Sequence, residues 1–113
     1  MATYKAPLED MRFVLNDVFE ADKLWASMSA TAEVTRDLSD AILDEAGKMV
    51  ENLLFPLNRE GDEQGCHFDN GEVTTPEGFK EAFKTYAENG WSAFSGSPEF
   101  GGQGMPKSLA VLF

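Results

Sequence analysis

The clearest pattern in the chain is a stripe of apolar residues at helical spacing between Leu38 and Leu57. The stripe consists of Ile42, Leu43, Ala46, Met49, Val50, Leu53, Leu54 and Leu57. Charged and amide side chains fill the opposite face, which predicts a helix with one buried side. Thr35 or Ser39 is the expected N-cap. Pro56 is expected to mark the last turn or a kink, because a proline ring clashes with the carbonyl four residues back.

Two shorter stripes predict a helix before and a helix after this one. The first follows Pro7 and consists of Leu8, Met11, Leu15, Val18 and Phe19; the second consists of Phe79, Ala82, Phe83, Tyr86 and Ala87. Thr75 and Pro76 are typical of an N-cap followed by a first helical residue, and Gly90 is typical of the position just past a helix C-terminus. Asp22 is a candidate cap for a short helical turn through Trp25.

The segment 59–75 is polar and rich in glycine, which predicts a loop. Within it, Asp69-Asn70-Gly71 is a turn signal, because Asn and Gly tolerate positive φ. The residues on either side, at 67–68 and 72–73, are expected to pair as a very short hairpin. The predicted fold class is therefore all-α, a small helical domain with a hairpin near residues 67–73.

Composition narrows the class of protein further. The 113 residues are 42% hydrophobic, which is enough for one small core despite a net charge of −11. The nine Lys and Arg residues are scattered, and this argues against both a nucleic-acid surface and a site for anionic lipid. No apolar run approaches the roughly 18 residues of a membrane span. Cys66 is the only cysteine, so no internal disulfide can form, and we expect a cytoplasmic protein.

The glycine-rich segment Gly90–Pro106 is the main candidate for chemistry. Gly101-Gly102-x-Gly104 resembles a phosphate cradle at a helix N-terminus. However, Lys107 stands where a dinucleotide fingerprint requires its third glycine, and no strand is expected before the loop. A tight turn between helices, in which glycine permits positive φ and close backbone approach, explains the pattern better.

The remaining polar clusters predict no site. Cys66 and His67 are adjacent, whereas zinc requires three or four ligands and a nucleophilic pair must converge. The spacing of the acidic loop does not match that of a calcium-binding loop; its residues are Asp62, Glu63, Asp69, Asn70 and Glu72. We therefore assign no catalytic, cofactor-binding or metal-binding residue.

The string Pro98-Glu99-Phe100-Gly101-Gly102-Gln103-Gly104 resembles the Pro-Glu-aromatic-Gly-Gly-x-Gly signature near the N-terminus of the acyl-CoA dehydrogenases. Further segments are similar to the branch that includes long-chain and 3-(methylthio)propanoyl-CoA dehydrogenases. They are residues 4–16, 42–48, 56–62 and 74–79, and the pair Gly90-Trp91. The resemblance thus covers nearly the whole chain.

The resemblance implies a flavoenzyme with a helical N-terminal domain, a middle β domain and a C-terminal helical bundle. Such enzymes use a glutamate to remove the α-proton of an acyl-CoA, and the β-hydrogen leaves as hydride to FAD. The product is a trans-2-enoyl-CoA, and the electrons pass to an electron-transfer flavoprotein. The family's catalytic glutamate and flavin motifs lie downstream of the matching region, so none is carried over.

On this basis we expect residues 1–36 to be an N-terminal helical extension and residues 37–113 the start of the helical domain. The apolar run Leu109–Phe113 has no C-terminal cap. It is expected either to be cut in mid-helix, as in a truncated chain, or to fold into the core. The leading hypothesis is an N-terminal fragment that acts as a scaffold and is inactive alone. The alternatives are a non-enzymatic helical module, which associates through exposed stripes or as a homo-oligomer, and a small metal-binding protein.

Overall fold

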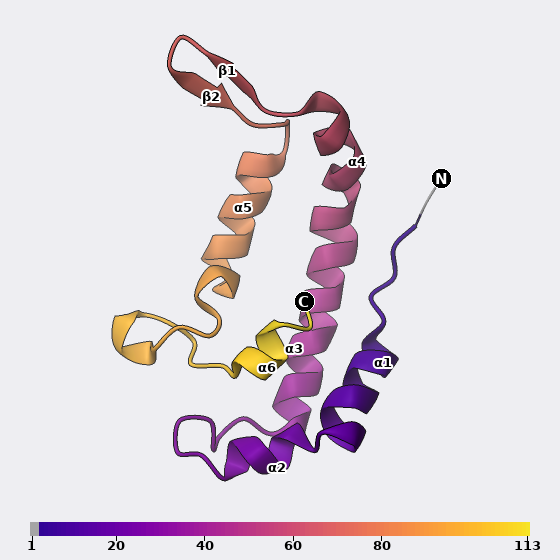
Figure 1. Cartoon of the computed structure of the whole chain (residues 1–113), viewed down its shortest axis with the longest axis vertical. Helices are drawn as coiled ribbons and strands as arrows, with labels where there is room; N and C mark the ends of the chain where they lie inside the picture. The colour runs from indigo at the N-terminus through magenta and orange to yellow at the C-terminus, as the bar shows by residue number, and fades with distance from the viewer. Residues whose placement is uncertain (1–2) are drawn as a thin grey trace.

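The computed structural model describes residues 3–113 and is mostly helical, which confirms the predicted fold class (Figure 1). The α-helices are α1 (Leu8–Arg12), α2 (Ala21–Ala26), α3 (Arg36–Met49), α4 (Phe55–Gln64), α5 (Phe79–Glu88) and α6 (Lys107–Ala110). Two π-helical segments, η1 (Phe13–Val18) and η2 (Val50–Leu54), extend α1 and join α3 to α4. The 3-10 turns are η3 (Trp91–Ala93) and η4 (Pro98–Phe100), and the strands are β1 (His67–Asp69) and β2 (Glu72–Thr74).

One continuous helical rod, α3–η2–α4, runs along the molecule (Figure 1). Of the two predicted caps, Thr35 is the N-cap, and its side chain accepts a hydrogen bond of 3.2 Å from the N–H of Leu38. The rod continues past the predicted end at Leu57 to Gln64. Pro56 lies in the first turn of α4, directly after the wider turns of η2. That position tolerates its missing N–H, so the proline does not end the rod.

Helix α5 begins later than the sequence pattern predicts. Thr75 and Pro76 are not its cap and first residue; Gly78, at φ 86°, precedes the first helical residue, Phe79. The ring of Phe79 lies over Gly61 of α4, and Gly78 lies against Leu57. Packing against the rod therefore sets the start of α5 and overrides the local signal. The C-terminal end of α5 agrees with the prediction, since Gly90 directly follows the C-cap residue Asn89 and has a φ of 83°.

The predicted hairpin is present between α4 and α5. Strands β1 and β2 are antiparallel and pair Phe68 with Val73. The turn between them has positive φ at Asn70 (48°) and Gly71 (80°), as expected for this dipeptide. Every residue of both strands is exposed, and the hairpin projects from one end of the molecule (Figure 1).

The core lies toward the opposite end from the hairpin, where α1, α2, α3 and α6 meet. Trp25, Leu43 and Leu109 are fully buried there. The buried side chains packed with them are Leu15, Ala21, Val34 and Phe94. The indole N–H of Trp25 donates a 3.0 Å hydrogen bond to Oγ of Ser108, which ties α2 to α6.

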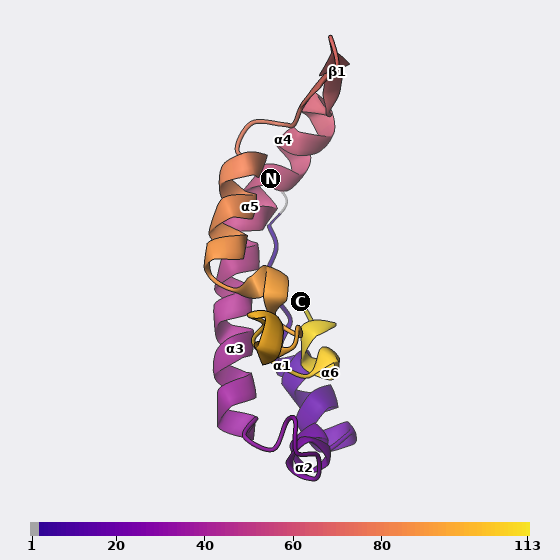
Figure 2. The ribbon, with the colours of Figure 1, turned by 90° about the vertical axis from the view of Figure 1, so that its left-hand side faces the viewer.

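The molecule is flat and elongated rather than compact. Its extents are 53 × 38 × 17 Å, and Figure 2 shows the thin dimension edge-on. The radius of gyration is 16.9 Å, whereas a compact domain of this length has about 13 Å. Residues near the hairpin thus contribute little to the core.

The C-terminal apolar run is divided between core and surface. Leu109 is fully buried, Leu112 and Phe113 are half-buried against the core, and Val111 is exposed. The Phe113 ring packs edge-on against Trp91 and Phe94, with centroids 5.1 Å from each. The expected truncation and the division at residues 36 and 37 stay predictions.

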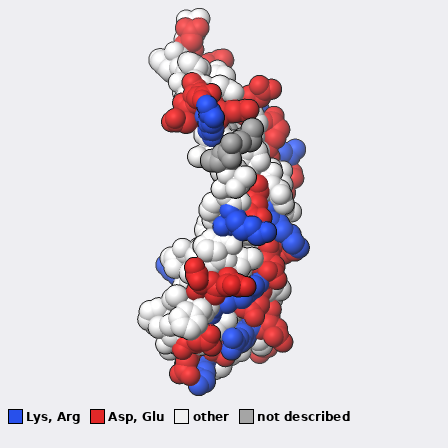
Figure 3. All heavy atoms as spheres, turned by 90° about the vertical axis from the view of Figure 1, so that its right-hand side faces the viewer, with Lys and Arg blue, Asp and Glu red and all other residues white. Residues whose placement is uncertain are grey.

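The surface carries mixed charge. On the face drawn in Figure 3, basic side chains lie among acidic ones rather than in a continuous patch. Among residues 3–113, no helix is both long and apolar enough to cross a membrane.

Candidate functional site

The glycine-rich segment folds into a tight, internally bonded turn. Gly101 and Gly104 have φ of 86° and 67°, values that favour glycine. Gly102 lies directly on the backbone of Gly96, so closely that a Cβ at position 102 would overlap it. The path of the backbone therefore favours glycine at positions 101 and 104 and requires it at position 102.

Hydrogen bonding shows that this turn is not a phosphate cradle. The backbone N–H groups of residues 100–105 all donate to carbonyl oxygens within residues 93–98. Those of Gly102, Gln103 and Gly104 do so at 2.9 Å, to Ser97, Ala93 and Gly96. An anion site at a loop requires free N–H groups aimed at the ligand, and here each is already bonded. The turn instead fixes η3 and η4 relative to α6.

The other polar candidates do not converge. Cys66 is exposed and His67 lies in β1. The acidic residues were expected in one loop, but Asp62 and Glu63 lie on α4, and the rest lie on the hairpin. Glu63 accepts a 3.0 Å hydrogen bond from Arg59 one helical turn earlier. Within the part of the chain that the structure describes, no three or more His, Cys, Asp and Glu residues are grouped to hold a metal ion.

The ion pairs of the described residues lie on the surface and are structural. Arg12 bridges α1 to α3 through the backbone carbonyl of Asp40, at 3.2 Å, and the carboxylate of Asp44. On α3, a hydrogen bond from Lys48 to Glu45, together with the negative charge of Glu45, raises the pKa of Lys48 above its ordinary value. Exposed pairs of this kind contribute little to stability. The Lys48–Glu45 pair borders an open surface pocket of about 600 Å³ between the rod and α5, together with Asn52 and Thr85.

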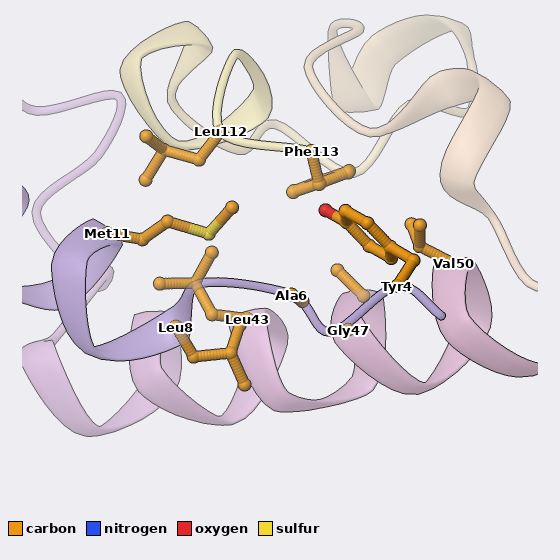
Figure 4. A pocket seen from close by; sticks show the side chains of 10 residues that line it. Tyr4, Ala6, Leu8, Met11, Leu43, Gly47, Val50, Leu112 and Phe113 are labelled. Carbon is orange, nitrogen blue, oxygen red and sulfur yellow. The ribbon is translucent and has the colours of Figure 1, made fainter. Parts of the chain in front are cut away.

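A small apolar cavity lies beneath the N-terminal segment Tyr4–Pro7, which we call the strap (Figure 4). Its volume is about 90 Å³. The strap, α1, the rod and the C-terminal residues form its walls. The lining residues are Tyr4, Ala6, Leu8, Met11, Leu43, Ala46, Gly47, Val50, Leu112 and Phe113. We refer to this space as the strap cavity.

Gly47 allows the strap to lie close to the rod. A Cβ at this position would lie 3.4 Å from the Ala6 Cβ and from a Leu8 methyl group. The N–H of Ala6 donates a 2.7 Å hydrogen bond to Oε1 of Glu51, and the rings of Tyr4 and Phe55 lie 6.0 Å apart. The sequence pattern did not reveal the strap. The sequence feature that could have indicated it is Gly47, a glycine in the middle of the longest predicted helix.

A larger apolar groove separates the rod from α5. It encloses about 300 Å³ and is lined by Leu54, Leu57, Asn58, Phe79, Ala82, Phe83 and Tyr86. Its lining combines parts of the two strongest apolar stripes in the sequence. Phe83 remains 66% exposed, so the groove is an open apolar surface rather than part of the core.

Comparison with known proteins identifies the relatives of this fold. No family model matches the chain. Over 109 residues, which are 96% of the chain, it is 33% identical to 3-methylmercaptopropionyl-CoA dehydrogenase of Ruegeria pomeroyi. It is also 33% identical over 90 residues, or 77% of the chain, to butyryl-CoA dehydrogenase of Syntrophomonas wolfei. The chain is related to the acyl-CoA dehydrogenases, in their N-terminal region.

The chain spans less than a fifth of the length of these dehydrogenases, 18% of the first and 15% of the second. The two matches confirm the predicted resemblance to the acyl-CoA dehydrogenase N-terminal region. In the signature turn Pro98–Gly104, which carries that resemblance, the backbone N–H groups of residues 100–104 are all bonded to carbonyl oxygens of the same turn region.

The glycine turn does not provide a site for the diphosphate of FAD. The diphosphate of FAD requires free N–H donors or clustered cations. The N–H groups of the glycine turn are bonded internally, and the single lysine beside it, Lys107, has no basic neighbour in sequence. No residue of the glycine turn is therefore assigned to the cofactor.

Proposed function

We propose that this chain is the N-terminal helical part of an FAD-dependent acyl-CoA dehydrogenase and serves as a scaffold for it. In this proposal the chain is inactive alone, and FAD and the catalytic glutamate belong to other parts of the enzyme. One observation carries the proposal: 96% of the chain matches a dehydrogenase of which it spans only 18%.

The surface area of the chain supports a scaffold role. A compact protein of 12.4 kDa exposes about 6,100 Å², whereas this chain exposes 8154 Å². The excess, roughly 2,000 Å² on this one chain, is more than the roughly 800 Å² that each partner buries in a standard protein interface. Such an excess is expected of a piece that packs against further protein.

In the full enzyme, the reaction we propose is the α,β-dehydrogenation of an acyl-CoA thioester to a trans-2-enoyl-CoA. Bound FAD supplies the hydride acceptor, and an electron-transfer flavoprotein is the proposed partner that receives the electrons. The contribution of this chain is apolar surface that supports one wall of the substrate cleft and excludes water. The names of the two relatives, a 3-methylmercaptopropionyl-CoA and a butyryl-CoA dehydrogenase, favour an acyl-CoA as the substrate class. We propose the cytoplasm as its compartment, since a chain with one cysteine needs no oxidising environment.

A flavin titration of the purified 113-residue chain tests the proposal that the chain is inactive by itself. We expect no stoichiometric yellow complex with FAD and no reduction of an electron acceptor by butyryl-CoA. A chain that bound FAD one to one and dehydrogenated the thioester would contradict the scaffold proposal.

A second candidate function is a non-enzymatic helical module that associates through an exposed apolar face. The open groove beside Phe83 favours it. Its test is the mass of the chain in solution and its binding of hydrophobic dyes. A monomer that binds neither dye nor partner would contradict the module, whereas a stable homo-oligomer without any flavin-dependent role would favour it over the scaffold.

A further inference from the structure

We propose that the strap cavity is a binding site for a small apolar molecule, about the size of a xenon atom or a short alkyl group. The strap, Tyr4–Pro7, is the wall that moves to admit it. This inference does not rest on the dehydrogenase proposal, because it depends only on the packing of residues 4–11 against the rod.

The size of the cavity sets the class of ligand. Its volume of about 90 Å³ is roughly three times the share of one water molecule in the liquid. An apolar cavity of about 150 Å³ in another protein accommodates benzene or xenon. The strap cavity is therefore large enough for a single heavy atom or a few carbon atoms, and smaller than the space that held an aromatic ring.

The lining makes the ligand apolar. Of the ten residues around the cavity, only Tyr4 carries a polar side-chain group. Figure 4 shows the Tyr4 hydroxyl beside Phe113, while Leu8, Met11 and Leu43 turn hydrocarbon and thioether groups inward. The side chains of the lining offer one hydrogen-bonding group, the Tyr4 hydroxyl, whereas a buried water needs two to four partners. An apolar occupant instead gains dispersion contacts with the walls that face empty space.

The strap is the weakest wall. The opposite wall is the rod, where Leu43 and Ala46 are 0% and 1% exposed. In contrast, the strap is held by the hydrogen bond from Ala6 to Glu51 and by the ring contact of Tyr4 with Phe55. Within residues 3–113, its backbone forms no other long-range hydrogen bond. Separation of Ala6 from Glu51 would open the cavity without disturbing the rod.

Xenon is the probe, and methyl NMR of the 113-residue chain under xenon pressure is the measurement. We expect saturable shifts at the methyl groups of Met11 and Leu43. The variant Ala46→Leu fills the cavity and should lower the apparent affinity at least tenfold. The matched control Ala87→Leu makes the same change on α5, outside the cavity lining, and should leave the shifts unchanged. If Ala46→Leu does not fold, Ala6→Val fills the cavity from the strap and serves in its place.

Shifts that increase without saturation, or that persist after the cavity is filled, would overturn the proposal. Equal shifts at Leu54 and Leu57 in the open groove would do the same, since they would mean unspecific contact. The moving wall has its own test. Glu51→Ala should raise the exchange rate of xenon severalfold, while Glu51→Gln, which keeps an acceptor oxygen, should change it less. Identical rates in both variants would show that the strap is not the entry.

Discussion

Gly102 lies on the backbone of Gly96 at a distance that leaves no room for a side chain. This contact closes the turn that contains the dehydrogenase signature. The N–H groups that such a loop could offer to a phosphate are used to hold it closed. The signature thus marks a structural junction between η3, η4 and α6.

Replacement of Gly102 tests that junction. Gly102→Ala places a Cβ against the Gly96 backbone, so we expect a loss of about 2–4 kcal/mol in the free energy of unfolding, as for overpacked sites. Urea denaturation measures it. The control is Gly101→Ala, where φ is 86° but no atom lies within 4 Å; it should cost only about 1 kcal/mol. Equal losses in both variants would mean that the Gly96 contact is unimportant.

The N-cap of the rod gives a second prediction. Thr35→Ala removes the acceptor for the N–H of Leu38 and should lower the free energy of unfolding by about 1 kcal/mol. Thr75, which precedes Pro76, was also predicted as an N-cap, but it does not cap α5. Thr75→Ala should therefore change stability by less than about 0.5 kcal/mol. A larger loss from Thr75 than from Thr35 would contradict the observed helix starts.

The hydrogen bond that links α2 to α6 gives a third prediction. Ser108→Ala leaves the N–H of the buried Trp25 without its partner, and we expect a cost of about 1–2 kcal/mol. Thermal unfolding followed by Trp fluorescence reports it. Ser92 is an exposed serine on η3, and Ser92→Ala serves as the control with no comparable loss. If Ser108→Ala were neutral, α6 would be held by its apolar contacts alone.

The open groove gives a fourth prediction. Phe83→Ser should lower the fluorescence of a bound hydrophobic dye severalfold while stability changes by less than about 0.5 kcal/mol, because the side chain is exposed. Phe68→Ser at the hairpin is the matched control, since Phe68 is exposed at 75% but lies outside the groove. A similar loss of dye from Phe68→Ser would show that the groove is not the main apolar surface.

Sequence periodicity predicted the helical fold, the Asn70-Gly71 hairpin and the glycine after α5, since each follows from local chemistry. It was wrong where tertiary packing decides the result. The start of α5 depends on Phe79 meeting Gly61 and on Gly78 meeting Leu57, contacts between residues distant in sequence. The rod continues past the predicted end at Leu57 to Gln64. A π-helical segment directly precedes the turn that contains Pro56, and no simple sequence pattern predicts such a segment.

The candidate site, too, could be predicted from the sequence only in part. Spacing alone favoured a turn over a phosphate cradle at Gly101–Gly104, but only the bonded N–H groups decide it. The strap cavity depends on Ala6, Gly47 and Glu51 coming together across more than 40 residues. Apolar stripes mark which side of a helix is buried, yet they do not say which segment covers it.

A chimera tests the scaffold claim most directly. The region of the Ruegeria pomeroyi 3-methylmercaptopropionyl-CoA dehydrogenase that matches this chain is replaced by the chain itself, and FAD content and turnover are measured. Two controls are the relative without any such region and the chain alone. The account predicts that the chimera retains FAD and dehydrogenates its acyl-CoA, while neither control does. A relative that remained fully active after loss of this region, or a chain active by itself, would contradict the account.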